Sequence, residues 1–566
     1  MSDQALNDAA AAVDTAANAL WQSRLQTEPA LRQTHNLPLE QLPDGSLDQA
    51  QQQADEGRAL LRQLATLDET TLDPDRSLTL AVLRFEAARR ADAVLAWHRV
   101  SPVAPYSSID HGMTARGTLA RVVVEDAAGL DRWVALWRDL SAGLRHALDR
   151  LHAQADQGWR LARPAIAPAR TAWERLGPQL AAQLDAQTHS PAAMALAPAL
   201  RTAWQTEAAR LRDEAVLPAV QAVVQALADP AYAAVAPNDV GLARQPGGEA
   251  EYARLIGLHL SEAQDPARIH AVGLQQLSVL AERMREVRSR LGFNGDEATF
   301  HTRLRTDPRA LAPSPEVLGD RYRHCLARLQ PLLPQLFHDL PASPYAVRRL
   351  DAAMEAAITF GYYEPPRRAG EPGIYFFNAG ELATRLQLNV APLTYHELAP
   401  GHHFHFARQM EMDSLHPLRR NAFGYTVFNE GWAEYAAALA EEQGLFDDPY
   451  DLYGLLSLQR FGALRLVVDT GCNALGWTLA QAQRCMREHS LGGEAEVASE
   501  SLRYSTDMPG QALAYRWGFL QFMAARDDAR ARQGARFDLR DFHQAALGAG
   551  ALPLPAWRGH LERELG

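Results

Sequence analysis

The chain has 566 residues and a formal net charge of -12, and all of its basic residues are arginines because the sequence contains no lysine. The absence of lysine excludes a Schiff-base lysine, a phosphate-binding P-loop and a serine-lysine dyad. The acidic balance, without any arginine-rich run, also argues against nucleic acid as a partner, since phosphate binding needs a concentrated basic face.

Cysteine usage and the amino-terminal sequence bear on the cellular compartment. Cys325, Cys472 and Cys485 are widely spaced and form neither a disulfide framework nor a C-x-x-C site. The first twenty residues carry acidic side chains where a secretory signal would carry positive charge, and no apolar run is long enough to span a bilayer. We therefore expect a cytoplasmic protein without a membrane span, or a periplasmic one if a signal peptide has been removed.

The first region, residues 1–235, is predicted to form long packed helices. It is rich in Ala, Leu, Arg, Gln and Glu, with apolar residues at helical spacing, as in AVLRFEAARRADAVLAW. A Pro- and Gly-containing interval at 229–252 interrupts this pattern and marks the boundary to a second region, residues 236–566. We expect the second region to hold the catalytic site and the two regions to pack as one cleft-forming unit.

Beyond the boundary, helical sequence resumes at Asp265, which can cap a helix, and Pro266, which can occupy its first turn. Strand signals are scarce, and the clearest is GIYFFN at 373–378. This segment is either an ordinary buried strand or an edge strand beside a cleft, which could align an extended peptide, and Asn378 at its end is a candidate substrate-binding residue. The predicted fold class is mainly α, a large helical fold around a cleft, with a small β element next to the candidate metal site.

Histidines are concentrated in the segment TYHELAPGHHFHFARQ. It contains His396 and Glu397, followed by His402, His403 and His405. In the zincin motif H-E-x-x-H, two imidazoles one helical turn apart reach one metal and the Glu faces the bound water. Here the first two candidate ligands, His396 and His402, are six positions apart, which is roughly 600° of rotation on an ideal helix, so a straight helix cannot bring their rings together.

Two residues between these histidines change that geometry. Pro400 removes an N–H and disfavours helical geometry at the residue before it, while Gly401 can adopt conformations that other residues cannot. A local bulge at this point would absorb two residues and return His402 to the metal-facing side. The segment is therefore a candidate metal site despite its unusual spacing.

A carboxylate ligand is supplied by the helical segment FNEGWAEYAAALAEEQG. Glu430 and Glu434 stand at i and i+4 in it, so they project from one helix face. Catalytic zinc commonly takes its third protein ligand, a carboxylate, from a separate helix and leaves the fourth position for water. We assign that role to Glu430, and we expect Glu434 to accept a hydrogen bond from a ligating imidazole.

These motifs resemble known families. VFNEGWAEY resembles the segment that supplies the glutamate ligand in gluzincin aminopeptidases, and HELAPGHH resembles the H-E-x-x-P-G-H signature of a bacterial family, domain of unknown function 885, grouped with gluzincin-like metallopeptidases. Further matching segments include GGEAEY, YYEPP, PGIYFFN, RLVVDTGCNALGW and RYSTDMPGQALAYRWG. The resemblance implies a mainly helical fold, one zinc held by His396, His402 and Glu430, and hydrolysis of a peptide or related amide.

The resemblance also assigns groups opposite the metal. Tyr515, with Tyr504 as the alternative, would donate a hydrogen bond to the developing oxyanion, and Arg503 would bind a substrate carboxylate. The sequence departs from the family pattern at His405, where Gln is usual, and at Asn473, where His is usual. The second departure bears on substrate choice and turnover.

The predicted function is zinc-dependent hydrolysis of a peptide bond, in which Glu397 takes the proton of a metal-activated water and passes it to the leaving nitrogen. One alternative is a hydrolase of a small non-peptide amide that uses the same ligands. Another is a helical binding protein whose metal site is vestigial or structural. A structural zinc site is closed by four protein ligands, so His403 or His405 completing the shell would favour that last alternative.

Overall fold

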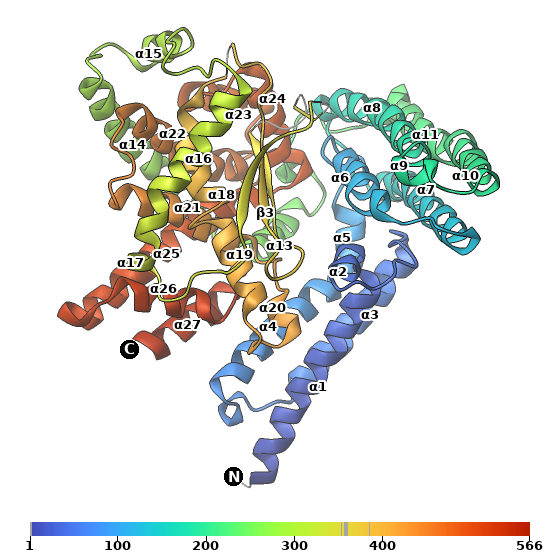
Figure 1. Ribbon diagram of the computed structural model, residues 1–566, viewed down its shortest axis with the longest axis horizontal. Helices are drawn as coiled ribbons and strands as arrows, with labels where there is room; N and C mark the ends of the chain where they lie inside the picture. The colour runs from blue at the N-terminus through green and yellow to red at the C-terminus, as the bar shows by residue number, and fades with distance from the viewer. Residues whose placement is uncertain (1–2, 353, 356–359, 384) are drawn as a thin grey trace.

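The computed structural model describes residues 3–352, 354–355, 360–383 and 385–566, and helices dominate it (Figure 1). The predicted mainly α fold class is confirmed. Within the described residues, no helix is both long and apolar enough to cross a membrane.

The first region consists of antiparallel helices joined by short connections. Its longer helices are α1 (Asp3–Thr27), α3 (Leu47–Leu64), α4 (Pro74–Ala91), α7 (Ala127–Asp156), α8 (Arg163–Thr188), α10 (Pro198–Leu211) and α11 (Leu217–Ala228). Helices α7, α8, α10 and α11 pack against one another around Trp133, Trp137 and Trp173, which are fully buried. Burying such large apolar side chains on one face of each helix is what holds this bundle together.

The second region contributes the helices that carry the candidate site. They are α13 (Gly248–Leu260), α14 (Pro266–Arg290), α16 (Pro315–Leu329), α18 (Val390–Glu397), α19 (His402–Glu411), α21 (Thr426–Glu442), α22 (Pro449–Asn473), α24 (Glu494–Leu502), α25 (Ala514–Gln533), α26 (Leu539–Gly548) and α27 (Leu554–Leu565). The predicted helix start is confirmed, since Pro266 opens α14 and the Asp265 side chain accepts a hydrogen bond from the amide of Ala267. Helix α14 lies along α22, and Gly273 allows this close approach because a Cβ there would lie 2.7 Å from Val467 Cγ2.

Among the described residues, the β element consists of three short strands: β1 (Tyr345–Arg349), β2 (Gly361–Glu364) and β3 (Gly373–Phe377). The strand predicted at 373–378 is β3, but it is the central strand, parallel to β1 and antiparallel to β2. The alternative of an edge strand that aligns a peptide was therefore wrong, because both hydrogen-bonding edges of β3 are already paired, and the alternative of an ordinary buried strand is confirmed. Sequence reasoning missed its two partners, which are short and flanked by Pro-containing segments.

The two regions are joined by contacts between residues far apart in the sequence. Helix α4 packs against α27, the amide of Tyr106 donates to Asp507 Oδ1 at 3.1 Å, and Arg121 pairs with Glu364 at 3.1 Å. In Figure 1 the blue-to-teal helices of the first region lie to one side of the sheet, and the orange-to-red helices of the carboxy-terminal third lie to the other.

Candidate metal centre

The chain turns sharply between the first two candidate ligands. Helix α18 ends at Glu397 and α19 begins at His402, and the connection contains a cis Ala399–Pro400 peptide bond. The expected bulge within one helix is thus a break between two helices, because Leu398 and Gly401 both leave helical backbone geometry. The new helix direction returns His402 to the side of His396.

Gly401 is required at this break for a steric reason. A Cβ at this position would lie 1.8 Å from the carbonyl oxygen of His396 and 2.5 Å from that of Tyr395. Only a residue without a side chain allows the start of α19 to approach the end of α18 so closely. The connection is also tied to α21, because the Trp432 indole donates a hydrogen bond to the Pro400 carbonyl at 2.9 Å.

The three predicted ligands lie together. His396 Nε2 and His402 Nε2 are 3.6 and 3.4 Å from Glu430 Oε2, and the two imidazole rings are nearly perpendicular, with centroids 4.8 Å apart. One donor atom from each of the three residues lies within 4.8 Å of the others. Among the described residues, Glu430 Oε2 has no hydrogen-bond partner although it is buried.

A pair of glycines allows helix α21, which carries Glu430, to cross helix α25, which carries Tyr515, at close range. A Cβ on Gly431 would lie 2.6 Å from the backbone of Gly518, so α21 and α25 cross with almost no side chain between them. This crossing places Tyr515, at the start of α25, beside the same cavity as Glu430. The Gly that follows Glu430 in the sequence therefore has a packing role.

Three carboxylates surround the two imidazoles. Burial alone would raise the pKa of Glu430, but His402 and His396 outweigh it and hold this pKa well below the usual range. Burial raises the pKa of Glu397 and of Glu434, against the opposing effect of the imidazoles. Burial would lower the pKa of His396, but Glu430, Glu397 and Glu434 outweigh it and raise this pKa to about 9. The cluster therefore favours positive charge at its centre, which a divalent cation would supply in place of a proton.

The candidate ligands open onto a cavity of about 460 Å³. The predicted site residues that line it are His396, Glu397, His402, Glu430, Glu434 and Tyr515. Further lining residues include Phe360, Tyr363, Phe406, Phe423 and Arg465. The metal donors, the candidate base and the candidate oxyanion donor thus share one cavity.

Arg503 and Tyr504, predicted to bind substrate, do not line this cavity. Both are buried and bind the carboxylate of Glu500, to which Arg503 donates at 3.0 Å. Tyr504 instead holds another cation, because Arg465 Nε donates to the Tyr504 hydroxyl at 3.0 Å.

Arg465 is the cavity residue that sequence reasoning missed. Its guanidinium lies 4.1 Å above the centre of the Tyr515 ring, and the side chain borders the cavity. Burial and Glu430 raise the pKa of Tyr515 to about 12, while Arg465 acts in the opposite direction. The signal was present, since Arg465 is the first residue of RLVVDTGCN, a segment read only for its resemblance.

The other histidines of the cluster are engaged elsewhere. His403 bonds to the Tyr363 hydroxyl at 2.9 Å through Nδ1 and to the Ser343 carbonyl at 3.0 Å through Nε2. His405 Nε2 lies 3.0 Å from Asn429 Oδ1. Burial lowers the pKa of His403 to about 4 and that of His405 to about 3, so both are neutral at pH 7.

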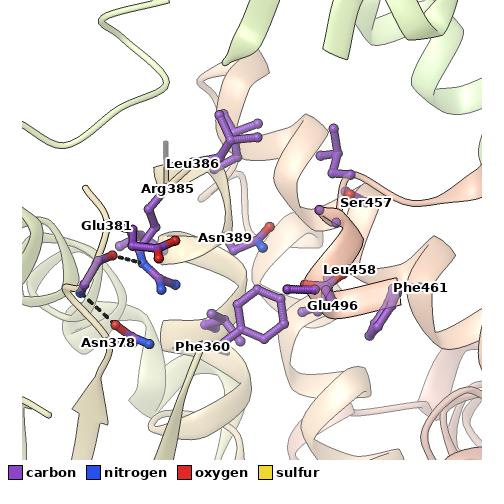
Figure 2. A pocket seen from close by; sticks show the side chains of 18 of the residues that line it. Phe360, Asn378, Glu381, Arg385, Leu386, Asn389, Ser457, Leu458, Phe461 and Glu496 are labelled. Carbon is purple, nitrogen blue, oxygen red and sulfur yellow. Dashed lines mark hydrogen bonds between the residues drawn. The ribbon is translucent and has the colours of Figure 1, made fainter. Parts of the chain in front are cut away.

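Asn473 and Asn378 also lie outside the lining of the metal cavity. Asn473 is fully buried, accepts a hydrogen bond from the amide of Leu242 at 3.0 Å and donates to the Tyr504 carbonyl at 2.9 Å. The departure from the family pattern at Asn473 therefore falls on a residue that ties α22 to its neighbours. Asn378 lines an adjoining hollow (Figure 2). Its side-chain amide donates to the Glu355 carbonyl at 2.7 Å.

Fold and site together define a largely helical protein with two histidines and one glutamate at the wall of a cavity. The chain belongs to the family described as "Bacterial protein of unknown function (DUF885)", whose model matches residues 29–561. This finding confirms the resemblance to domain of unknown function 885.

Two solved structures share the fold. A "putative lipoprotein" from Colwellia psychrerythraea has a TM-score of 0.86 at 22% identity, with 99% of each chain covered. A protein described in the same words and as of unknown function, from Shewanella oneidensis, has a TM-score of 0.70 at 15% identity, with 97% of this chain and 99% of that chain covered. No curated protein matches the sequence.

Proposed function

We propose that this protein is a zinc-dependent hydrolase of peptide or related amide bonds, with His396, His402 and Glu430 as the metal ligands. The observation that carries the proposal is the spacing of the donor atoms. Two ligands of one tetrahedral zinc, each about 2.0–2.1 Å from the metal, lie about 3.4 Å from each other. The two imidazole-to-carboxylate distances of 3.4 and 3.6 Å match this value and are long for hydrogen bonds.

The surroundings of the ligands support the same assignment. Glu434 Oε1 lies 4.0 Å from His396 Nδ1, on the far side of the ring from the nitrogen that faces Glu430. The hydrogen bond expected between these atoms is not formed, since His396 Nδ1 has no partner among the described residues. A small shift of the Glu434 carboxylate would form it, and would then orient the ligating imidazole and fix its tautomer. Zinc, when bound, would supply a Lewis acid that polarises a carbonyl group and makes water acidic.

Glu397 is the candidate general base. It follows His396 directly, lines the cavity and is half-buried, so its carboxylate can reach a water in that space. Its role is to accept a proton from the attacking water and to deliver it to the leaving nitrogen. Burial, which raises its pKa, increases the basicity of this carboxylate.

Tyr515 is the candidate donor to the developing oxyanion. It borders the same cavity as the ligands, and with a pKa of about 12 its phenol keeps its proton throughout the neutral range. Arg465, stacked on the Tyr515 ring, holds that ring in place and adds positive charge to the wall where negative charge develops.

The structural-site alternative receives no support from the neighbouring histidines. A structural zinc needs four protein ligands, and His403 and His405 are bonded to other groups and lie outside the three-residue cluster. A non-peptide amide substrate uses the same residues and is separated from a peptide by substrate tests alone.

The sequence-based expectation of a cytoplasmic location stays a prediction. Both similar structures are described as lipoproteins, which supports the periplasmic alternative for this chain. Fractionation of cells that produce the full-length protein decides between the two compartments.

The proposal is tested by digesting a peptide library with the zinc-loaded wild type and with Glu397→Gln. Gln keeps the size of the side chain and removes its basicity, so the variant should retain zinc and lose at least about a hundredfold in turnover. Equal product formation by the two proteins, or no cleavage of any peptide by the zinc-loaded wild type, would overturn the proposal.

A further inference from the structure

A second hollow adjoins the metal cavity. It has a volume of about 650 Å³, and four apolar residues line both spaces: Phe360, Leu393, Leu458 and Phe461. Figure 2 shows Phe360 in the middle of this hollow, with Leu458 and Phe461 facing it. A substrate held at the metal centre can therefore extend past these side chains into the second space.

Glu496, from α24, borders the second hollow. Within the described part of the chain it accepts no hydrogen bond and forms no ion pair, although it is half-buried. By contrast, Glu355, which also lines the hollow, binds Arg349 at 2.9 Å and the Ala379 amide at 3.1 Å. A partly desolvated carboxylate without a partner is unfavourable unless a ligand compensates it.

The electrostatic surroundings leave Glu496 undercompensated. Burial, followed by the negative charge of Glu500 one turn further along α24, raises the pKa of Glu496 to about 7, while Arg465 and Arg385 lower it. Both arginines are held by other groups, because Arg465 donates to Tyr504 at 3.0 Å and Arg385 donates to the Gly380 carbonyl at 2.8 Å. Neither of them is hydrogen-bonded to Glu496.

One further feature of the hollow favours a hydrogen-bond donor as the ligand, and another gives the Glu496 carboxylate its place. The Oδ1 atom of Asn389, an acceptor, has no partner among the described residues. Gly492 leaves room for the Glu496 carboxylate, since a Cβ at Gly492 would lie 2.0 Å from Glu496 Oε1. In Figure 2, Asn389 lies between the side of the hollow with Arg385 and the side with Glu496.

We propose that the second hollow binds a positively charged group of the substrate, an ammonium or a guanidinium, through Glu496. Phe360, Leu458 and Phe461 pack against the apolar stem that carries the charge. The inference rests on the proposed function and gives it a substrate class, namely peptides with a basic side chain or a free amino terminus within reach of this subsite. A charge-assisted hydrogen bond of this kind contributes enough to change affinity by about tenfold or more.

The test uses alanine pentapeptides in which one position at a time is lysine or its uncharged counterpart norleucine, each with a free or an acetylated amino terminus. The wild type should cleave the best lysine peptide with a kcat/KM about tenfold or more above that of its norleucine counterpart. Glu496→Gln should abolish this preference and leave the norleucine peptide within about twofold. If lysine and norleucine peptides are cleaved alike, but acetylation lowers kcat/KM about tenfold or more in the wild type and not in Glu496→Gln, the bound group is the terminal ammonium.

The matched control is Glu494→Gln in the same helix, because Glu494 is exposed and pairs with Arg487 outside the hollow. It should behave as the wild type. A wild type without charge preference, or an equal effect of Glu496→Gln on charged and neutral peptides, would overturn the subsite and leave the hydrolase intact.

A binding measurement separates the two proposals. The affinities of the lysine and norleucine pentapeptides for Glu397→Gln and for the Glu397→Gln, Glu496→Gln double variant are measured by calorimetry. A lysine preference that disappears in the double variant supports the subsite even if no peptide is ever hydrolysed. Equal affinity of Glu397→Gln for the lysine and norleucine peptides, together with equal affinity for free and acetylated amino termini, would overturn the subsite.

Discussion

Gly401 offers the sharpest test of how the two histidines are brought together. In Gly401→Ala the new Cβ would lie 1.8 Å from the His396 carbonyl oxygen, roughly 1.6 Å short of the 3.4 Å at which ordinary van der Waals contact begins. The ends of α18 and α19 must therefore move apart by an amount of that order. Metal-ligand distances tolerate deviations of only about 0.2 Å, so a displacement of this size removes His402 from the ligand set.

We expect zinc affinity of Gly401→Ala to fall at least about a hundredfold, more than the loss of a second-sphere partner causes. Zinc content after dialysis against a graded series of chelator concentrations measures this, with circular dichroism to confirm that the protein is folded. Gly424→Ala is the matched control, because Gly424 lies in the nearby connection before α21 and a Cβ there meets no atom within 4 Å. Equal zinc affinity of the two variants would refute the steric explanation of the break.

Three other predictions follow from the same geometry. His402→Ala should lose zinc, whereas His403→Ala should keep it and unfold more easily, because His403 bonds only to protein groups; metal analysis and thermal unfolding compare the two. Tyr515→Phe should lower kcat by about a hundredfold, because it removes the hydrogen bond to the oxyanion. Tyr504→Phe should keep kcat within a few-fold and lower the free energy of unfolding by about 1 kcal/mol. Steady-state kinetics measures the first quantity and urea unfolding the second. Burial and Glu500 raise the pKa of Glu496 to about 7, against the opposing effect of Arg465 and Arg385. The preference for the lysine peptide should therefore increase as the pH rises through this value, because only the ionised carboxylate binds a cation. A preference that is flat between pH 6 and 8 would contradict this prediction.

Much of the fold was predictable because its helices carry local signals. The capping of α14 by Asp265 and the apolar spacing of the first region depend on residues close in sequence, and both were predicted correctly. The sheet was only partly predictable. Strand β3 has an aromatic and β-branched run of its own, whereas β1 and β2 are short segments that are stabilised by pairing with it.

The candidate site was predictable as a set of residues but not as a shape. Pro400 and Gly401 indicated that the helix would be irregular, but the sequence alone gave no means to distinguish a bulge from two separate helices. Arg503 and Tyr504 were assigned to the cavity from their position in a motif, whereas their side chains face Glu500. Which way a side chain points depends on contacts between α22, α24 and α25, and those contacts join residues far apart in the chain.

The central claim is that His396, His402 and Glu430 hold one zinc ion with a position left open for water. Crystals of the zinc-loaded protein, measured at the zinc absorption edge, test it most directly through the anomalous difference map. The account predicts one strong peak per chain, about 2.0–2.2 Å from an imidazole nitrogen of each histidine and from a carboxylate oxygen of Glu430, with no fourth protein ligand. A peak on His403 or His405, a peak closed by four protein ligands, or no peak near these residues would contradict it.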